Sequence, residues 1–183
     1  MKYTFLSLIF ASAFSLAGAQ QNYMTRDGYI KFFSHTPIED ITAENKAVGS
    51  IINSGTGEIV ITLKMTDFQF EKKLMQEHFN ENYVESEKFP KATFKGFITD
   101  NNKIDYSEKG VYEVMVKGDM TIHGVTRQVS AAGTVEVIKD GIIAKTSFKL
   151  NPEDYDISIP GVVRNKIANE MEISADMKYE VMD

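Results

Sequence analysis

Cysteine and tryptophan are absent from the 183 residues, and proline occurs only four times. Without cysteine the chain forms no disulfide, so its hydrophobic core alone must stabilise the fold. The same absence excludes the cysteine that carries the lipid of a bacterial lipoprotein. The Gly-x-Ser-x-Gly turn that presents the nucleophile of many serine hydrolases is also missing. Thiol chemistry is therefore excluded, and serine-based catalysis finds no support.

Positive charge is scarce relative to negative charge. The chain has 20 Lys and Arg against 26 Asp and Glu, which gives a formal net charge of −6. It contains no tract of basic residues of the kind that binds phosphate backbones. The same sign of charge argues against attachment to anionic lipid headgroups. We therefore expect no nucleic-acid partner.

Possible metal ligands are few and scattered. The three histidines, His35, His78 and His123, fall on different expected elements, whereas a metal site needs ligands that converge. The acidic residues between positions 81 and 87 are typical of a solvated face rather than of an acid/base pair. We expect no metal ion, no cofactor and no enzymatic activity.

The N-terminal residues have the features of a secretory signal peptide. Lys2 precedes an apolar run over residues 5–17, and Ala17-Gly18-Ala19 has the small-x-small form of a cleavage site. The run is too short to span a bilayer comfortably. We expect residues 1–19 to be removed, leaving one domain over residues 20–183. The mature protein is expected to be periplasmic or secreted, without stable membrane insertion.

Apolar and polar residues alternate along most of the mature chain, which is the pattern of half-buried strands. From position 171 to 181, for example, every second residue is apolar and the residues between are polar. The segments expected as strands are 23–34, 41–52, 59–66, 92–99, 112–122, 129–137, 142–150 and 171–181. Short turns join most of them, which predicts an antiparallel up-and-down meander. Closure into an eight-stranded barrel would remove the exposed sheet edges.

Two segments interrupt the alternation. Residues 68–83 have apolar positions at near-helical spacing, which predicts a short amphipathic helix between the third and fourth strands, packed against one end of the barrel. Residues 151–170 form a long crossing, for which Val162, Val163 and Ile167 are the expected anchors. Long connections in compact barrels are often lids or binding loops.

The inner face contains many small residues, namely Gly96, Gly118, Ala131, Gly133, Ala144 and Ala175. An eight-stranded barrel is wide enough to be filled by side chains or to hold one small ligand. Small residues favour the hollow alternative, although large residues from opposite walls would give a filled core. A hollow interior with a hydrocarbon wall suits an apolar chain rather than a sugar or a nucleotide.

The expected ligand-binding residues lie on the apolar stripes and at one barrel end. They are Phe32, Ile61, Leu63, Phe79, Phe94, Val114, Val116, His123, Val135, Phe148 and Met177. His78 and His123 are placed to flank a barrel mouth and bond the headgroup of the ligand. The stripe of Val114, Val116, Val135, Phe148 and Met177 is expected to face the interior, with Glu136 and Lys178 outside.

One hairpin has a distinctive sequence, Gly-Asp-Met-Thr-Ile-His-Gly-Val-Thr-Arg-Gln-Val, over residues 118–129. Together with the segments at 28–34, 41–45, 56–59 and 89–94, it resembles the YceI-like family. That resemblance implies an all-β, lipocalin-like barrel that is exported and holds a polyisoprenoid, an isoprenoid quinone or a similar fatty amphiphile. The chain departs from the family at Asp156, where many members have glycine.

Three alternatives remain open at this stage. A membrane barrel would turn the apolar stripes towards lipid, but it would normally have aromatic girdles and a terminal aromatic residue. A lipid-modifying enzyme would need His123 as its proton carrier. A structural or inhibitory protein would act through the outside of a barrel whose interior is packed.

Overall fold

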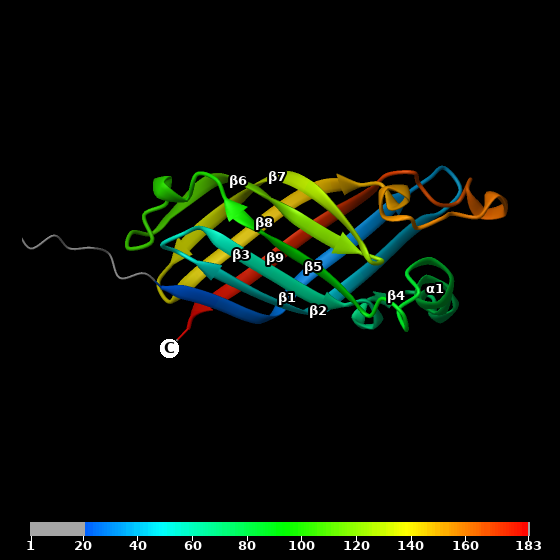
Figure 1. Ribbon diagram of the computed structural model, residues 1–183, viewed down its shortest axis with the longest axis horizontal. Coiled ribbons are helices and arrows are strands. Elements are labelled where there is room, and N and C mark those ends of the chain that lie inside the picture. The colour runs from blue at the N-terminus through cyan, green and yellow to red at the C-terminus, as the bar shows by residue number, and fades with distance from the viewer. Residues whose placement is uncertain (1–20, 183) are drawn as a thin grey trace, which may run out of the picture.

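The computed structural model describes residues 21–182, so the expected signal peptide at 1–19 lies outside the described part of the chain. Eight long strands form one antiparallel sheet that closes on itself (Figure 1). They are β1 Asn22–His35, β2 Asp40–Asn53, β3 Glu58–Lys64, β5 Lys91–Ile98, β6 Gly110–Ile122, β7 Val125–Ile138, β8 Gly141–Leu150 and β9 Met171–Val181. Each pairs with the next long strand, and β1 also pairs with β9. The predicted up-and-down barrel is confirmed.

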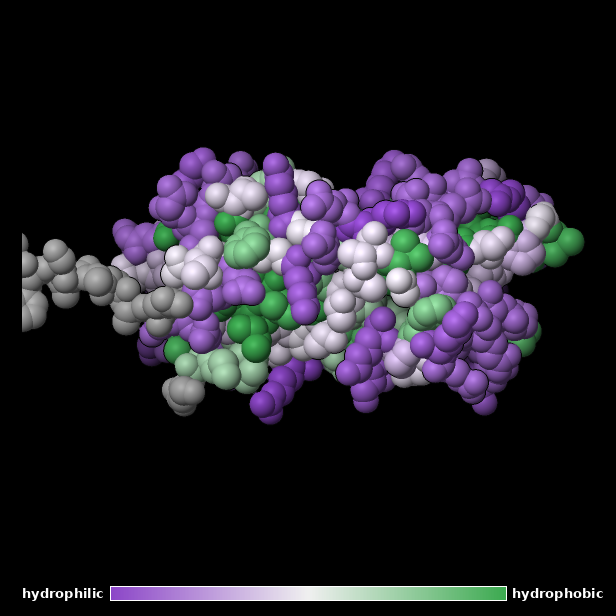
Figure 2. All heavy atoms as spheres, in the orientation of Figure 1, coloured by the Kyte–Doolittle hydropathy of each residue, from purple (hydrophilic) through white to green (hydrophobic). Residues whose placement is uncertain are grey.

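The alternation of the sequence separates an inner face from an outer one. On β9, Met177 and Tyr179 are buried, whereas Asp176 and Lys178 are exposed. On the outer face Lys145 Nζ lies 2.8 Å from Asp176 Oδ2. Hydrophilic residues cover most of the face seen in Figure 2. Charged residues thus point outwards, which is opposite to the arrangement that the membrane-barrel alternative requires.

The segment between β3 and β5 differs from the single helix predicted over residues 68–83. It consists of a 3-10 turn (Met65–Asp67), the two-residue strand β4 (Gln69–Phe70), helix α1 (Lys73–His78) and a π-helical turn (Phe79–Tyr83). β4 pairs with β2 and so extends the barrel wall. That pairing keeps the start of the segment extended, and the helix begins only after it.

Aromatic packing explains why this segment has near-helical spacing without being one helix. Phe68, Phe70 and Phe79 surround Phe32 of β1, and neighbouring ring centroids are 5.1 to 5.7 Å apart. Leu74, which the helical pattern would turn inwards, is 61% exposed. Contacts between rings, rather than helical periodicity, therefore decide the local conformation.

The crossing from β8 to β9 contains two 3-10 turns, η4 (Pro152–Tyr155) and η5 (Gly161–Val163). Its buried anchors are Tyr155, Ile157 and Ile159. The prediction of Val162 as an anchor is wrong, because this side chain is 88% exposed. Val163 and Ile167 do face the barrel interior. The end of η4 and the residues just after it, not the Val-Val pair, therefore dock the crossing.

The helical elements are all short. Besides those already given, a 3-10 turn (Asn101–Lys103) lies in the connection between β5 and β6. Within residues 21–182, no helix is long and apolar enough to cross a bilayer. The strands therefore set the architecture.

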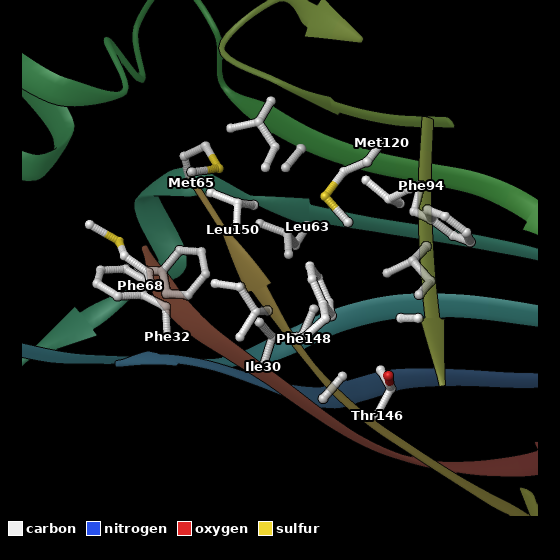
Figure 3. Close-up of a pocket in the computed structure, with 18 of the residues that line it drawn as sticks. Ile30, Phe32, Leu63, Met65, Phe68, Phe94, Met120, Thr146, Phe148 and Leu150 are labelled. Atoms are coloured by element: carbon white, nitrogen blue, oxygen red, sulfur yellow. The ribbon is translucent and has the colours of Figure 1, made fainter. Parts of the chain in front are cut away.

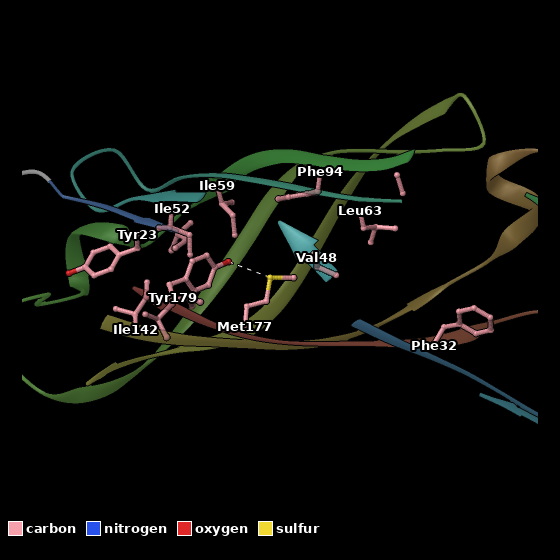
Figure 4. Close-up of a cluster of buried hydrophobic side chains, with 14 of the residues drawn as sticks. Tyr23, Phe32, Val48, Ile52, Ile59, Leu63, Phe94, Ile142, Met177 and Tyr179 are labelled. Carbon is pink, nitrogen blue, oxygen red and sulfur yellow. Dashed lines mark hydrogen bonds between the residues drawn. The ribbon is translucent and has the colours of Figure 1, made fainter. Parts of the chain in front are cut away.

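Side chains fill one end of the barrel (Figure 4). Tyr179, Ile52 and Ile142 expose 1% of their surface or less. Tyr23 stacks on Tyr106 of the β5–β6 connection, with ring centroids 5.6 Å apart. This end is a packed core that closes the barrel.

The phenols in this core carry no charge at neutral pH. The Tyr179 hydroxyl is hydrogen-bonded to Ser50 Oγ at 2.8 Å, and Ser50 Oγ donates to the carbonyl of Val60 at 3.0 Å. Burial raises the pKa of Tyr179 above its ordinary value. Burial, followed by the effect of Tyr23, raises the pKa of Tyr106 to about 12. The closed end is therefore neutral as well as packed.

Candidate ligand-binding site

The rest of the barrel is hollow. An internal cavity of about 420 Å³ is lined by residues of all eight long strands, and its size falls among those of known small-molecule pockets. Figure 3 shows Leu63, Phe94, Met120 and Phe148 pointing from different strands towards the same space. The wall is almost wholly hydrocarbon. Such a cavity binds by excluding water rather than by forming polar contacts.

Burial distinguishes the hollow part from the filled end. Val116, Met120 and Phe148 face the interior but are only half-buried. Val135 and Met177, nearer the filled end, are 1% and 2% exposed. An inward side chain that still exposes surface lacks a packing partner across the barrel. Most of the interior is therefore hollow, whereas side chains fill the end near Tyr179.

Most of the predicted ligand-binding residues line this cavity. They are Phe32, Ile61, Leu63, Phe79, Phe94, Val114, Val116, Val135, Phe148 and Met177. His123 is not among the residues of the wall. The structure thereby brings together the apolar residues of the expected site, and their contact with a ligand remains a prediction.

The small residues have two different roles. Four of them line the cavity: Ala131, Gly133, Ala144 and Ala175. Gly96 and Gly118 instead face each other across β5 and β6 beneath the ring of Phe94. A Cβ atom would lie 2.6 Å from Phe94 Cζ at Gly96 and 2.8 Å from it at Gly118. These two glycines make room for a side chain rather than for a ligand, which corrects the sequence-based assignment.

The cavity reaches solvent at the end formed by α1 and the crossing. Glu39, His78, Tyr83 and Lys166 are the polar residues at this mouth. Glu39 accepts a hydrogen bond from Lys72 Nζ at 2.9 Å. That bond, aided by the charge of Lys166, lowers the pKa of Glu39. His78 lies at a mouth as predicted, and a bond from it to a headgroup remains a prediction.

His123 has a different environment from the one predicted. It forms the β6–β7 turn with Gly124, and both have positive φ (51° and 77°). Its Nε2 lies 2.8 Å from Glu85 Oε2, and its Nδ1 lies 3.1 Å from the Tyr155 carbonyl oxygen. The ring also packs on Phe89 at 4.5 Å between centroids. His123 therefore links three connections of the fold. It does not line the cavity, so it cannot be the proton carrier that the enzyme alternative requires there.

The junction around His123 concentrates unusual backbone conformations. Among residues 21–182, the non-glycine residues with positive φ are Glu85 (43°), His123 (51°) and Asp156 (56°). His123 bonds Glu85 and the residue before Asp156. Such conformations disfavour most side chains, although aspartate tolerates them better than most. The left-handed backbone at Asp156 is a conformation that glycine adopts at no steric cost.

The histidines do not converge. His35 lies beside Asp40 at the β1–β2 turn, His78 lies on α1 and His123 lies at the hairpin tip. In the described part of the chain, no three His, Asp or Glu side chains come close enough to hold a metal ion. What the site offers is therefore an apolar chamber with a polar mouth.

Comparison with known proteins agrees with this architecture. A family model for the YceI-like domain matches residues 22–179. None of the curated proteins compared with the chain matches it.

Several solved structures share the fold at low identity. A polyisoprenoid-binding domain from Saccharophagus degradans, implicated in plant cell wall breakdown, is 13% identical with a TM-score of 0.77, over 89% of this chain and 99% of that one. BcnA of Burkholderia cenocepacia is 14% identical with a TM-score of 0.63, over 81% and 94%. A YceI protein of Campylobacter jejuni is 14% identical with a TM-score of 0.58, over 81% and 89%. At such identities, the likeness establishes the fold alone.

Proposed function

This chain is a member of the YceI-like family, and from that membership and its hollow barrel we propose that it binds a long-chain amphiphile. The observation that carries the proposal is the cavity of about 420 Å³ with a hydrocarbon wall. A sugar or a nucleotide would lose its hydrogen bonds to water there without replacement. An apolar chain has no hydrogen bonds to water to lose.

Burial of the chain supplies enough free energy for useful affinity. Each buried methylene contributes about 0.8 kcal/mol, so ten contribute about 8 kcal/mol before ordering costs are subtracted. Micromolar affinity corresponds to about 8 kcal/mol net, so a longer chain or a few polar contacts must make up the difference. No sharp polar motif is needed, which agrees with its absence from the interior.

The ligand class that we propose is a polyisoprenoid, an isoprenoid quinone or a similar lipid. The printed description of the Saccharophagus degradans domain as polyisoprenoid-binding supports this class. We also propose that the protein is exported and acts as a carrier rather than as an enzyme. The signal-like residues 1–19 support export. The position of His123 outside the cavity wall supports a carrier.

Native mass spectrometry of the protein purified from its own cells tests both parts of the proposal. The chain mass is expected to correspond to residues 20–183, with one additional lipid-sized mass bound per chain. Organic extraction should release that mass and identify it as an isoprenoid or a related amphiphile. A chain that retains residues 1–19 would contradict export. A chain without any bound lipid would favour the alternative of a barrel that acts through its outer surface.

A further inference from the structure

The barrel wall is incomplete between β7 and β8. These strands pair only through residues 133–138 of β7 and 141–146 of β8. The remaining residues, 125–132 and 147–150, are extended but form no ladder pair with each other. In Figure 1 the tip of the β6–β7 hairpin and the end of β8 lie apart. We call the opening between residues 127–132, residues 147–150 and η4 the side window.

Side-chain bonds to backbone carbonyls mark the two ends of the side window. At the paired end, Thr146 Oγ1 donates to the carbonyl of Ala132 at 2.7 Å. At the other end, Arg127 Nε donates to the carbonyl of Asp154 at 2.8 Å and holds η4 against β7. A strand rises about 3.3 Å per residue, so the window is about 16 Å long. It has defined borders and is not a frayed strand end.

A second cavity lies against the interior at the side window. This outer cavity, of about 320 Å³, lies between β7, β8 and η4. Val129, Phe148 and Leu150 line both cavities. The two cavities therefore meet at the side window, where these three side chains stand between them.

The inner cavity is apolar, like the chain of an amphiphile, and the outer cavity is polar, like its head. The inner wall is hydrocarbon, whereas polar residues contribute much of the outer one: Arg127, Gln128, Lys149, Asn151 and Asp154. We propose that the polar head of the ligand lies in the outer cavity and that its chain enters the barrel through the side window. This inference rests on the proposed function and assigns the head to a site separate from the mouth.

Arg127 is the residue best placed to bind that head. A guanidinium has five N–H donors, and Nε uses one of them for Asp154. Within residues 21–182 the other four have no bonded partner, whereas Lys149 is paired with Glu170 at 3.1 Å. The head must therefore accept hydrogen bonds, as the oxygen of a hydroxyl, carbonyl or phosphate does.

Substitution of Arg127 tests the assignment. Refolded wild-type protein and the Arg127→Leu variant are titrated with geranylgeraniol, with geranylgeranyl phosphate and with a hydrocarbon of the same chain length. A bond to a charged donor contributes enough that its loss weakens binding about tenfold or more. We expect that loss for the alcohol or the phosphate and none for the hydrocarbon. The probe that loses more identifies the class of head. Arg26→Leu, an exposed position on β1, is the matched control and should change nothing.

A reversible block of the side window provides a second test that leaves Arg127 in place. Continuing the β7–β8 register places Ser130 opposite Lys149, both on the outer face. In the cysteine-free chain, Ser130→Cys/Lys149→Cys is joined by a short bis-methanethiosulfonate cross-linker, which dithiothreitol removes. Cross-linking should weaken binding of the headed probe at least tenfold, and reduction should restore it. The control pair, Lys95→Cys/Asp119→Cys, consists of exposed residues across the intact β5–β6 ladder and should have no effect.

The outcomes separate this inference from the proposed function. If wild-type protein binds the probes and both the Arg127→Leu and the cross-linked proteins bind them equally well, the head site is wrong and the lipid-binding function stands. An equal loss for all three probes would show that Arg127 only supports η4, and it would also overturn the assignment. If wild-type protein binds none of the probes, the proposed function fails and the head site with it.

Discussion

Replacing Ala144 with phenylalanine is expected to remove ligand from the barrel without unfolding it. Ala144 lies on the inner face of β8, is half-buried and lines the cavity. In a packed core, such overfilling costs about 1–3 kcal/mol. In a hollow barrel the ring has space, so the thermal midpoint of ligand-free protein should hold or rise. Affinity for geranylgeraniol, measured on refolded protein, should fall at least tenfold, because the ring takes the space of the chain.

A variant with the same chemistry on the outer face is the control. Ala47 is exposed on β2 and lines neither cavity, so Ala47→Phe should leave both affinity and midpoint nearly unchanged. A large fall in midpoint for Ala144→Phe with unchanged affinity would show that the interior was already full.

Gly133 is not an equivalent position, although the sequence predicts the same role for it. A Cβ atom there would lie 2.5 Å from the carbonyl oxygen of Lys145 on the neighbouring strand. Backbone cannot move away as a flexible side chain does. Gly133→Leu would therefore strain the last paired residues of β7 and β8 and would not fill the cavity cleanly. Ala144 is the proper site for the experiment.

Gly118→Val is expected to lower the free energy of unfolding by about 3 kcal/mol, at the upper end of the usual cost of overpacking. A Cβ atom at 118 would lie 2.3 Å from the carbonyl oxygen of Lys95 and 2.5 Å from Cα of Gly96. The valine must therefore push β5 and β6 apart or displace the ring of Phe94. For a domain of this size, the thermal midpoint should fall by about 10 °C.

Gly161 provides the matched control, because a Cβ atom at 161 would meet nothing within 4 Å. Gly161→Ala should leave stability unchanged or raise it by less than about 1 kcal/mol, since alanine restricts the unfolded chain. If Gly118→Val were as harmless as Gly161→Ala, the close approach of β5 and β6 at this pair would be wrong.

The sequence predicts the barrel well because inner and outer faces alternate along each strand. Where apolar residues occupy one face throughout, as on β9, the pattern specifies both the strand and its orientation. The segment at 65–83 was less predictable, because the rings of Phe68 and Phe79 pack on β1 across the fold. The extent of pairing between β7 and β8 leaves no mark on the alternation, so the side window appears only in three dimensions.

The same contrast, between alternation along a strand and contacts across the fold, applies to the residues of the site. The apolar lining was predictable, because being on the inner face is enough to place a residue such as Val116 in the cavity wall. The role of His123 was not predictable, since its partners lie 38 residues before it (Glu85) and 32 residues after it (Tyr155) in the sequence. A hairpin histidine has the same local pattern whether it bonds a ligand or the backbone.

The most direct measurement of the central claim is methyl NMR of refolded protein with bound geranylgeraniol. Methyl groups of Leu63, Val116 and Leu150 line the cavity, whereas Ile51 and Val111 are 40% and 66% exposed. We expect intermolecular nuclear Overhauser effects from the isoprenoid chain to the three inner residues and none to the two outer ones. A bound ligand that shows Overhauser effects only to Ile51 or Val111, and none to the inner methyl groups, would contradict a chain held inside the barrel.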